Sequence, residues 1–190
     1  MGPGPAVHQR PKGVTVMAAN ARPLSRPVTS SVPRSGVLGS PRQVNVGHLH
    51  LSALASAPFW ARRYTRLFLR DCPGIPEDTA ETAQLIVSEL VTNATRACGG
   101  DLSGRESSYS RRAGLGIIRL SLRQFRDGLL IEVTDSSPDR PELIDADRDA
   151  EHGRGLMLVD ALSHEWGFFP APNGGKVVYA FLRLAAIADF

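Results

Sequence analysis

The stretch SELVTNA, residues 88–94, places a carboxylate, Glu89, four residues before a carboxamide, Asn93, in a largely apolar segment. Four residues make about one turn of an α-helix, so the two side chains are expected on one face. Polar groups among apolar neighbours are costly unless something satisfies them. One candidate is a hydrated Mg2+ ion, which prefers oxygen ligands, with the carboxylate accepting a proton from an attacking hydroxyl or water. The alternative is an exposed helix face with ordinary polar residues.

The segment around this motif predicts one long helix. Pro76 suits the first helical position, and the acidic pair at 77–78 favours the positive end of the helix dipole. The two glycines at 99–100 suit a C-terminal stop. The polar segment that follows, up to residue 114, predicts a mobile loop.

The sequence QVNVGHLHL, starting at Gln43, alternates imperfectly with period two and predicts a strand at a sheet edge. The next segment, PFWARRYTRLFLR, predicts a helix. Its large apolar side chains are expected to share one face: Trp60, Tyr64, Leu67 and Phe68. Arginines at 62, 66 and 70 form another face, which is either a partner surface or a solvated one.

The second half of the chain predicts strands joined by hairpins. Two apolar segments flank the turn Arg126–Asp127–Gly128, and Asp-Gly is a hairpin signal. A short helix, GRGLMLVDALS, comes before a last hairpin that turns at Asn173–Gly174–Gly175. The expected fold is a two-layer α/β (α+β) sandwich, with a mixed, mostly antiparallel sheet and helices on one face.

Two further sites stand out by their positions. Asp135 ends the apolar strand LLIEVT, where it could accept a hydrogen bond from an exocyclic amine or cap a turn. Gly153 and Gly155 flank Arg154 at the start of a helix. Backbone amides at such a helix start bind anions, and glycine lets a phosphate approach closely.

The positive charge of the chain is confined to its N-terminal part. Residues 1–44 hold six of the 22 basic residues and none of the 19 acidic ones, so residues 45–190 carry a net charge of −3. We expect 1–44 to be a disordered, basic, Pro/Gly-rich extension and 45–190 to be the folded domain. The extension could be a basic arm for an acidic partner, a solvated tail, or a consequence of an upstream start codon, with Met17 as the true start.

Two cysteines are too few for a disulfide scaffold, and no apolar segment is long enough to cross a membrane. We expect a reduced, cytoplasmic protein without a membrane partner. The body is acidic and poor in aromatic residues, which disfavours nucleic acid as a partner.

The order of SELVTNA, a strand ending in Asp135, a loop, GRGL and a terminal hairpin resembles the GHKL or Bergerat-fold histidine kinase-like ATPase domain over roughly residues 45–185. Within that fold, it is similar to the actinobacterial anti-sigma-factor serine-protein kinase group. The resemblance implies a serine/threonine-protein kinase that uses ATP and Mg2+ to phosphorylate an anti-anti-sigma (STAS-type) protein. It also implies a sigma factor as the second partner, a role in transcription regulation and a possible homodimer.

The resemblance also implies roles for single residues. Glu89 matches the general base, Asn93 the magnesium-binding asparagine and Asp135 the aspartate that recognises the adenine amino group. Residues 136–152 match the mobile lid, and Gly153, Arg154 and Gly155 match the segment near the phosphates. After the last glycines, where this group often has threonine, the chain has Lys176.

Two other functions remain open at this point. One is a non-catalytic regulatory module on the same fold that sequesters a partner without phosphotransfer. The other is a nucleic-acid binder that uses the basic tail, which would show steep salt dependence.

Overall fold

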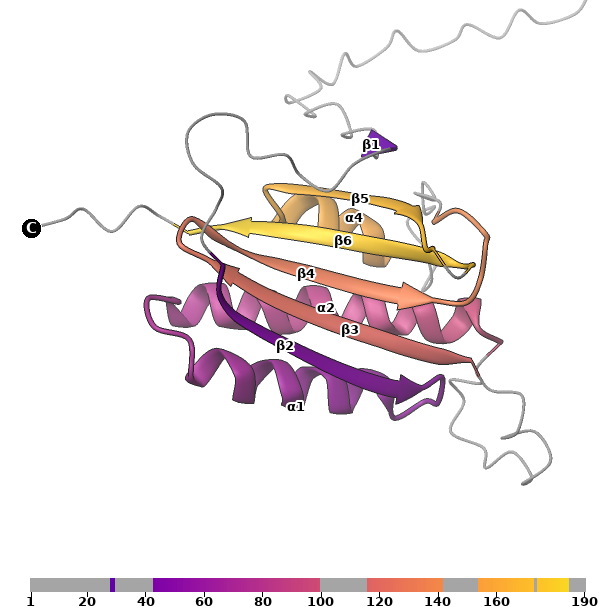
Figure 1. The fold of residues 1–190 in the computed structure, drawn as a ribbon, viewed down its shortest axis with the longest axis horizontal. Coiled ribbons are helices and arrows are strands. Elements are labelled where there is room, and N and C mark those ends of the chain that lie inside the picture. Colours follow the sequence, from indigo (N-terminus) through magenta and orange to yellow (C-terminus); the bar gives the residue numbers. More distant parts are fainter. Residues whose placement is uncertain (1–27, 30–42, 100–115, 142–153, 173, 185–190) are drawn as a thin grey trace, which may run out of the picture.

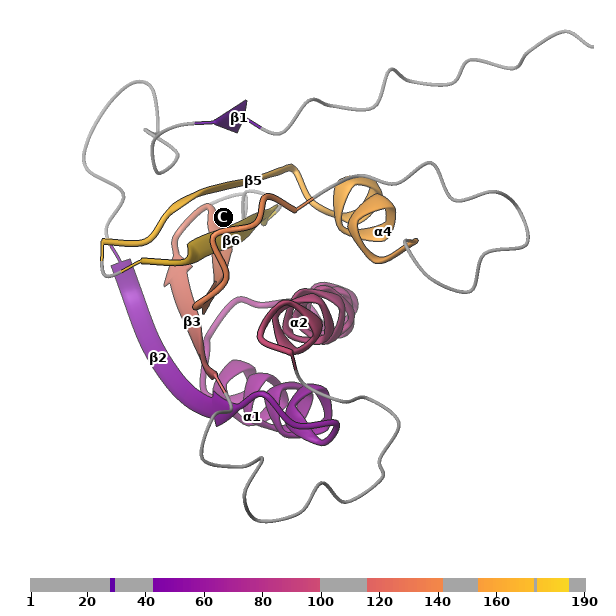
Figure 2. The same ribbon diagram turned by 90° about the vertical axis from the view of Figure 1, so that its right-hand side faces the viewer.

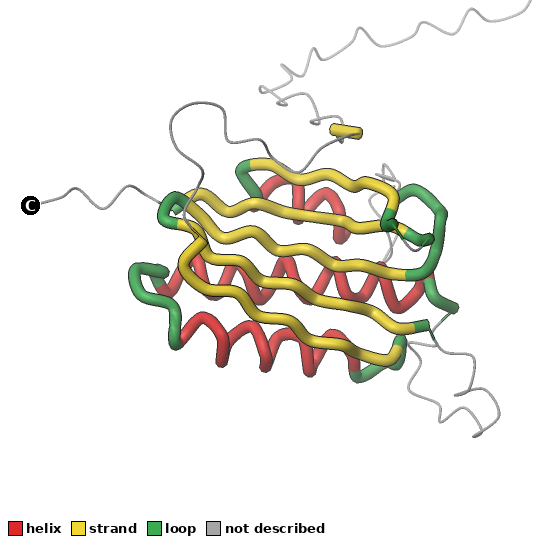
Figure 3. The backbone as a smooth tube through the Cα atoms, in the orientation of Figure 1, coloured by secondary structure: helices red, strands yellow, loops and turns green. Residues whose placement is uncertain are grey.

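The computed structural model describes residues 28–29, 43–99, 116–141, 154–172 and 174–184. They form one six-stranded sheet with the strand order β1-β5-β6-β4-β3-β2, and three helices (Figures 1 and 3). In chain order the elements are β1 (Val28–Thr29), β2 (Gln43–Ser52), α1 (Ala57–Arg70), α2 (Glu77–Ala97), β3 (Ile117–Phe125), β4 (Gly128–Asp135), α4 (Arg154–Leu162), β5 (Glu165–Pro170) and β6 (Lys176–Arg183).

The sheet is mixed but mostly antiparallel. The strands from β5 to β2 pair antiparallel, and the short β1 runs parallel to β5. Seen along the strands, the three helices of the described chain lie on one side of the sheet (Figure 2). The predicted fold, a two-layer sandwich with helices on one face, is therefore confirmed.

Strand β2 is an edge strand, as predicted. Its first half is open to solvent, as the exposed fractions of Val44 and Val46, 46% and 48%, show. Gly47 lies where the strand meets α1: a Cβ at this position would collide with the hydroxyl of Tyr64 and lie 2.7 Å from the ring of Phe68. The absence of a side chain thus lets the edge strand lie directly on the aromatic residues of α1.

Helix α2 begins after Pro76, which is the N-cap residue, one position outside the predicted place. It ends before Gly99, whose φ of 71° suits the predicted stop. Its buried side chains follow helical spacing: Ala83, Ile86, Val87, Leu90, Val91, Ala94 and Thr95. Glu89 and Asn93 lie at the margin of this buried stripe and are partly exposed.

The apolar face predicted for α1 is divided between core and solvent. Trp60 and Leu67 are 52% and 50% exposed, while Tyr64 and Phe68 pack against the core. The fully buried positions of α1 hold mostly small side chains: Ala57, Pro58, Ala61, Thr65 and Leu69. Small residues let two helices approach closely, so α1 turns these toward its neighbours and leaves Trp60 outside.

Strands β5 and β6 form the predicted terminal hairpin. Gly174 and Gly175 both have positive φ, 86° and 80°. A Cβ on Gly175 would also collide with the backbone carbonyl of Asp135, so this position requires glycine both for its φ and for lack of space. In the pairing between β4 and β6, Lys176 lies directly opposite Asp135.

Strand β2 begins at Gln43, next to the predicted domain boundary between residues 44 and 45, and that boundary stays a prediction. Apart from β1 and the first residues of β2, the predicted extension 1–44 lies outside the described residues. Most of the predicted loop at 98–114 lies outside them too, and these two predictions stay predictions. Within the described ranges, no helix is both long and apolar enough to cross a membrane.

Candidate functional site

A cavity of about 720 Å³ opens between α2, the ends of β4 and β6, and the first turns of α4. Its wall includes Leu90, Asn93 and Arg96 of α2, Asp135 of β4, Leu156 of α4 and Lys176 of β6. The fold thus brings two sequence-predicted residues, Asn93 and Asp135, to one cavity. Glu89 is not part of this wall and lies one helical turn before Asn93.

Glu89 and Asn93 share one helix face, as predicted, and that face meets the start of α4. A Cβ built on Gly155 would lie 2.5 Å from Glu89 Oε2 and 3.6 Å from Asn93 Nδ2. Gly155 therefore lets α4 come close enough to touch both side chains. This contact joins the SELVTNA motif and the glycine segment, which are far apart in the sequence, into a single site.

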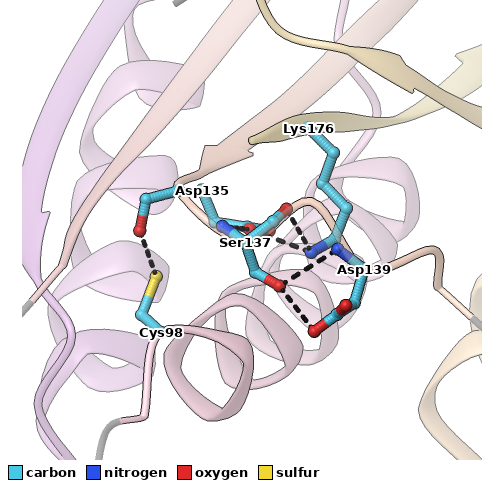
Figure 4. Close-up of polar contacts among 6 residues, drawn as sticks. Cys98, Asp135, Ser137, Asp139 and Lys176 are labelled. Carbon is cyan, nitrogen blue, oxygen red and sulfur yellow. Dashed lines mark hydrogen bonds and ion pairs between the residues drawn. The ribbon is translucent and has the colours of Figure 1, made fainter. Parts of the chain in front are cut away.

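Asp135 is 3% exposed and serves as a hydrogen-bond acceptor for two different groups. Its Oδ1 accepts from the backbone N–H of Ser137 at 2.9 Å and from Lys176 Nζ at 2.9 Å (Figure 4). The first bond is the turn cap that was one of the two predicted roles. The second is a buried ion pair, since the side chains of Lys176 and Asp135 are 8% and 1% exposed.

Lys176 is the site residue that the sequence did not point to. Its ammonium group also donates to the carbonyl oxygen of Ser137 at 3.2 Å. The sequence held one signal, the departure from threonine after the last glycines. It did not indicate that β6 would set this lysine against Asp135, which is 41 residues away.

The described start of the predicted lid, residues 136–141, is held by a tight turn at the cavity rim. Ser137 Oγ donates to Asp139 Oδ2 at 3.1 Å and accepts from the Asp139 N–H at 3.2 Å. Ser136 Oγ lies 3.5 Å from Cys98 Sγ at the end of α2. These contacts fix the position from which the rest of the loop departs.

The described residues of the site could hold a magnesium ion only together with other groups that complete the coordination shell of the ion. Asn93 offers an amide oxygen, and among the described residues no cluster of three or more His, Cys, Asp or Glu side chains could hold a metal. Mg2+ usually keeps several waters and binds substrate phosphates besides one or two protein ligands. Asn93 beside an open cavity fits that pattern.

Part of the predicted site lies outside the described residues. Gly153 and the lid from residue 142 on lie outside the described residues, and of Arg154 only the backbone at the start of α4 is described. Their predicted roles stay predictions.

The geometry of the site agrees with the protein family that the sequence matches. A family model described as a histidine kinase-like ATPase domain matches residues 52–180, well over half of the 190 residues. The chain therefore belongs to the histidine kinase-like ATPase family. The matched region contains Glu89, Asn93, Asp135 and Gly155. Comparison with curated proteins finds no match.

Proposed function

We propose that this histidine kinase-like ATPase domain binds ATP with Mg2+ and phosphorylates a serine or threonine of an anti-anti-sigma (STAS-type) protein. In its other state it would hold a sigma factor inactive, as partner switching requires. The observation that supports nucleotide binding best is the shared cavity. It unites Asp135 and Asn93, while Gly155 packs against Glu89 one turn from the cavity wall.

Glu89 is the proposed general base. Its carboxylate is partly exposed and lies against the first turn of α4, where a protein hydroxyl could reach it. In the proposed step, the substrate hydroxyl oxygen bonds to the γ-phosphorus of ATP and the bond from that phosphorus to the bridging oxygen of ADP breaks. The hydroxyl proton goes to Glu89.

Asn93 and α4 form the proposed phosphate end of the site. The Asn93 amide oxygen would hold Mg2+, which supplies positive charge to the phosphates when bound. The backbone amides in the first turn of α4, at Gly155, would bind phosphate oxygens, because a helix N-terminus favours anions. At the other end of the site, Asp135 would accept a hydrogen bond from the adenine amine.

The second candidate is a regulatory module of the same fold that binds a partner without phosphotransfer. One observation favours it: Oδ1 of Asp135 already pairs with Lys176, so this oxygen serves the fold and not a base. The two candidates differ in what they require of Glu89. Only phosphotransfer needs a carboxylate there.

The first experiment is calorimetry with Mg-ATP on the wild type and on Asp135→Asn. In this variant, the new side-chain carbonyl can still cap the turn, while an amide NH2 group replaces the second carboxylate oxygen. Binding that is lost in the variant would support the adenine assignment. If folded wild-type protein does not bind millimolar ATP, the kinase proposal is wrong.

Phosphotransfer is tested next, with candidate STAS-type proteins and labelled ATP. Glu89→Gln should bind ATP and fail to transfer phosphate. Glu81→Gln is the matched control, because Glu81 is an exposed carboxylate on the same helix. If Glu89→Gln regulates its partner as well as the wild type does, the non-catalytic module is the better description.

A further inference from the structure

Lys176 places a buried ammonium group in the wall of the candidate nucleotide cavity. The group is held by Asp135 Oδ1 and by the carbonyl oxygen of Ser137 (Figure 4). A buried ion pair brings little net stability, because the loss of hydration offsets the attraction. Its position in a cavity wall therefore suggests a role in binding.

Within the part of the chain that the structure describes, one donor hydrogen of Lys176 and one oxygen of Asp135 are not engaged in a hydrogen bond. An ammonium group has three donor hydrogens, and Lys176 directs two of them at Asp135 and Ser137. On Asp135, the hydrogen bonds from described residues all fall on Oδ1. One N–H of Lys176 and Oδ2 of Asp135 thus make no hydrogen bond within the described residues, and both residues line the cavity.

We propose that Lys176 is a specificity-determining residue for the base, a proposal that rests on nucleotide binding at this site. Adenine presents an amine donor at C6 next to an acceptor at N1. Oδ2 of Asp135 would accept from the amine, and the remaining N–H of Lys176 would donate to N1. In this pose the ion pair would read both groups of this edge.

The charge of Lys176 makes this reading selective. Hypoxanthine and guanine carry a carbonyl oxygen at C6 and an N–H at position 1. In the same pose the carbonyl would face a carboxylate and the N–H would face an ammonium group. An ammonium group cannot accept a hydrogen bond, whereas a threonine hydroxyl can either donate or accept. Lys176 therefore excludes bases that a hydroxyl at this place could tolerate.

The test uses calorimetry on the full chain with Mg-ATP, Mg-1-deaza-ATP and Mg-ITP. In 1-deaza-ATP a C–H replaces N1, so only the partner of Lys176 is removed. The wild type should bind 1-deaza-ATP roughly 10- to 100-fold more weakly than ATP, as expected for a hydrogen bond to a charged group. ITP should bind more weakly still. Equal binding of ATP and 1-deaza-ATP would overturn the proposal without affecting ATP binding itself.

Two variants localise the effect. In Lys176→Met, the ratio of the ATP and 1-deaza-ATP affinities should fall to about one. Arg183→Met is the matched control, because Arg183 is an exposed cation at the other end of β6, and it should keep the wild-type ratio. A preference that survives in Lys176→Met assigns N1 to another group and refutes the proposal. If Lys176→Met does not fold, the wild-type comparison still decides. Failure of the wild type to bind ATP would overturn the proposed function together with this inference.

Discussion

Replacing Gly155 with alanine should leave the fold intact and impair phosphoryl transfer. Gly155 is the second residue of α4 and does not have a positive φ, so its backbone accepts an alanine. The new Cβ would lie 2.5 Å from Glu89 Oε2, 3.5 Å from Glu89 Cδ and 3.6 Å from Asn93 Nδ2. Only the first of these distances is too short, and its atom belongs to the carboxylate of the proposed base.

The expected magnitudes follow from these distances. Ordinary contact begins at 3.4 Å, so Oε2 has to withdraw by about 0.9 Å. It is the tip of a flexible side chain, and its movement costs little. Exchanging glycine for alanine at a permitted backbone position gains about 0.4–1 kcal/mol. The free energy of unfolding should therefore stay within about 1 kcal/mol of wild type. A displacement of about 1 Å in a reacting group lowers the rate roughly 100-fold.

Two assays separate these effects: urea unfolding for stability, and turnover of Mg-ATP with a STAS-type substrate for transfer. Gly99→Ala is the matched control with the opposite profile. Its φ of 71° strains an alanine, yet no atom of the described residues lies within 4 Å of the added Cβ. It should lose about 1 kcal/mol of stability and keep its turnover. Full turnover in Gly155→Ala, or its unfolding, would refute the reasoning.

Three further predictions test the packing of the domain. Gly175→Ala should lower the free energy of unfolding by at least about 2 kcal/mol in urea titration, because its φ is positive and its Cβ meets the Asp135 carbonyl, which is backbone and cannot swing away. Lys176→Met should lower the free energy of unfolding by about 3–5 kcal/mol, because it leaves a buried carboxylate unpaired. The double variant with Asp135→Asn should recover most of this loss. If it recovers none, the loss does not come from the ion pair. Trp166→Ala should lower the free energy of unfolding by about 3–5 kcal/mol, seen as a large drop in melting temperature, because Trp166 is 4% exposed. Trp60→Ala should change this free energy by less than about 1 kcal/mol, because Trp60 is 52% exposed.

Local patterns predicted the parts of the site that lie on one element. The spacing of Glu89 and Asn93 sets them on one face of α2, because helical geometry depends on the backbone alone. The turn signal at Asp127–Gly128 likewise predicted the hairpin of β3 and β4, which pair in register from Gln124 to Arg119. Such signals need no knowledge of the neighbours.

Packing was harder to predict, because size does not decide burial. Trp60 has the largest side chain of α1 but is half exposed, and Ala61 next to it is completely buried. The helix layer needs close approach between α1 and α2, and an alanine allows it where a tryptophan does not. The identity of a buried face depends on the partner surface, which the sequence of one helix does not contain.

Lys176 shows the same dependence across two strands. Its pairing with Asp135 depends on the register between β4 and β6, in which Gly175 also lies against the Asp135 backbone. A shift of one residue would move every side chain of β6 to the other face of the sheet, and the lysine would leave the cavity. From the sequence, Lys176 was a departure from the threonine of similar proteins. In the fold it is the cation next to the carboxylate proposed to read the base, so the departure bears on which base the site selects.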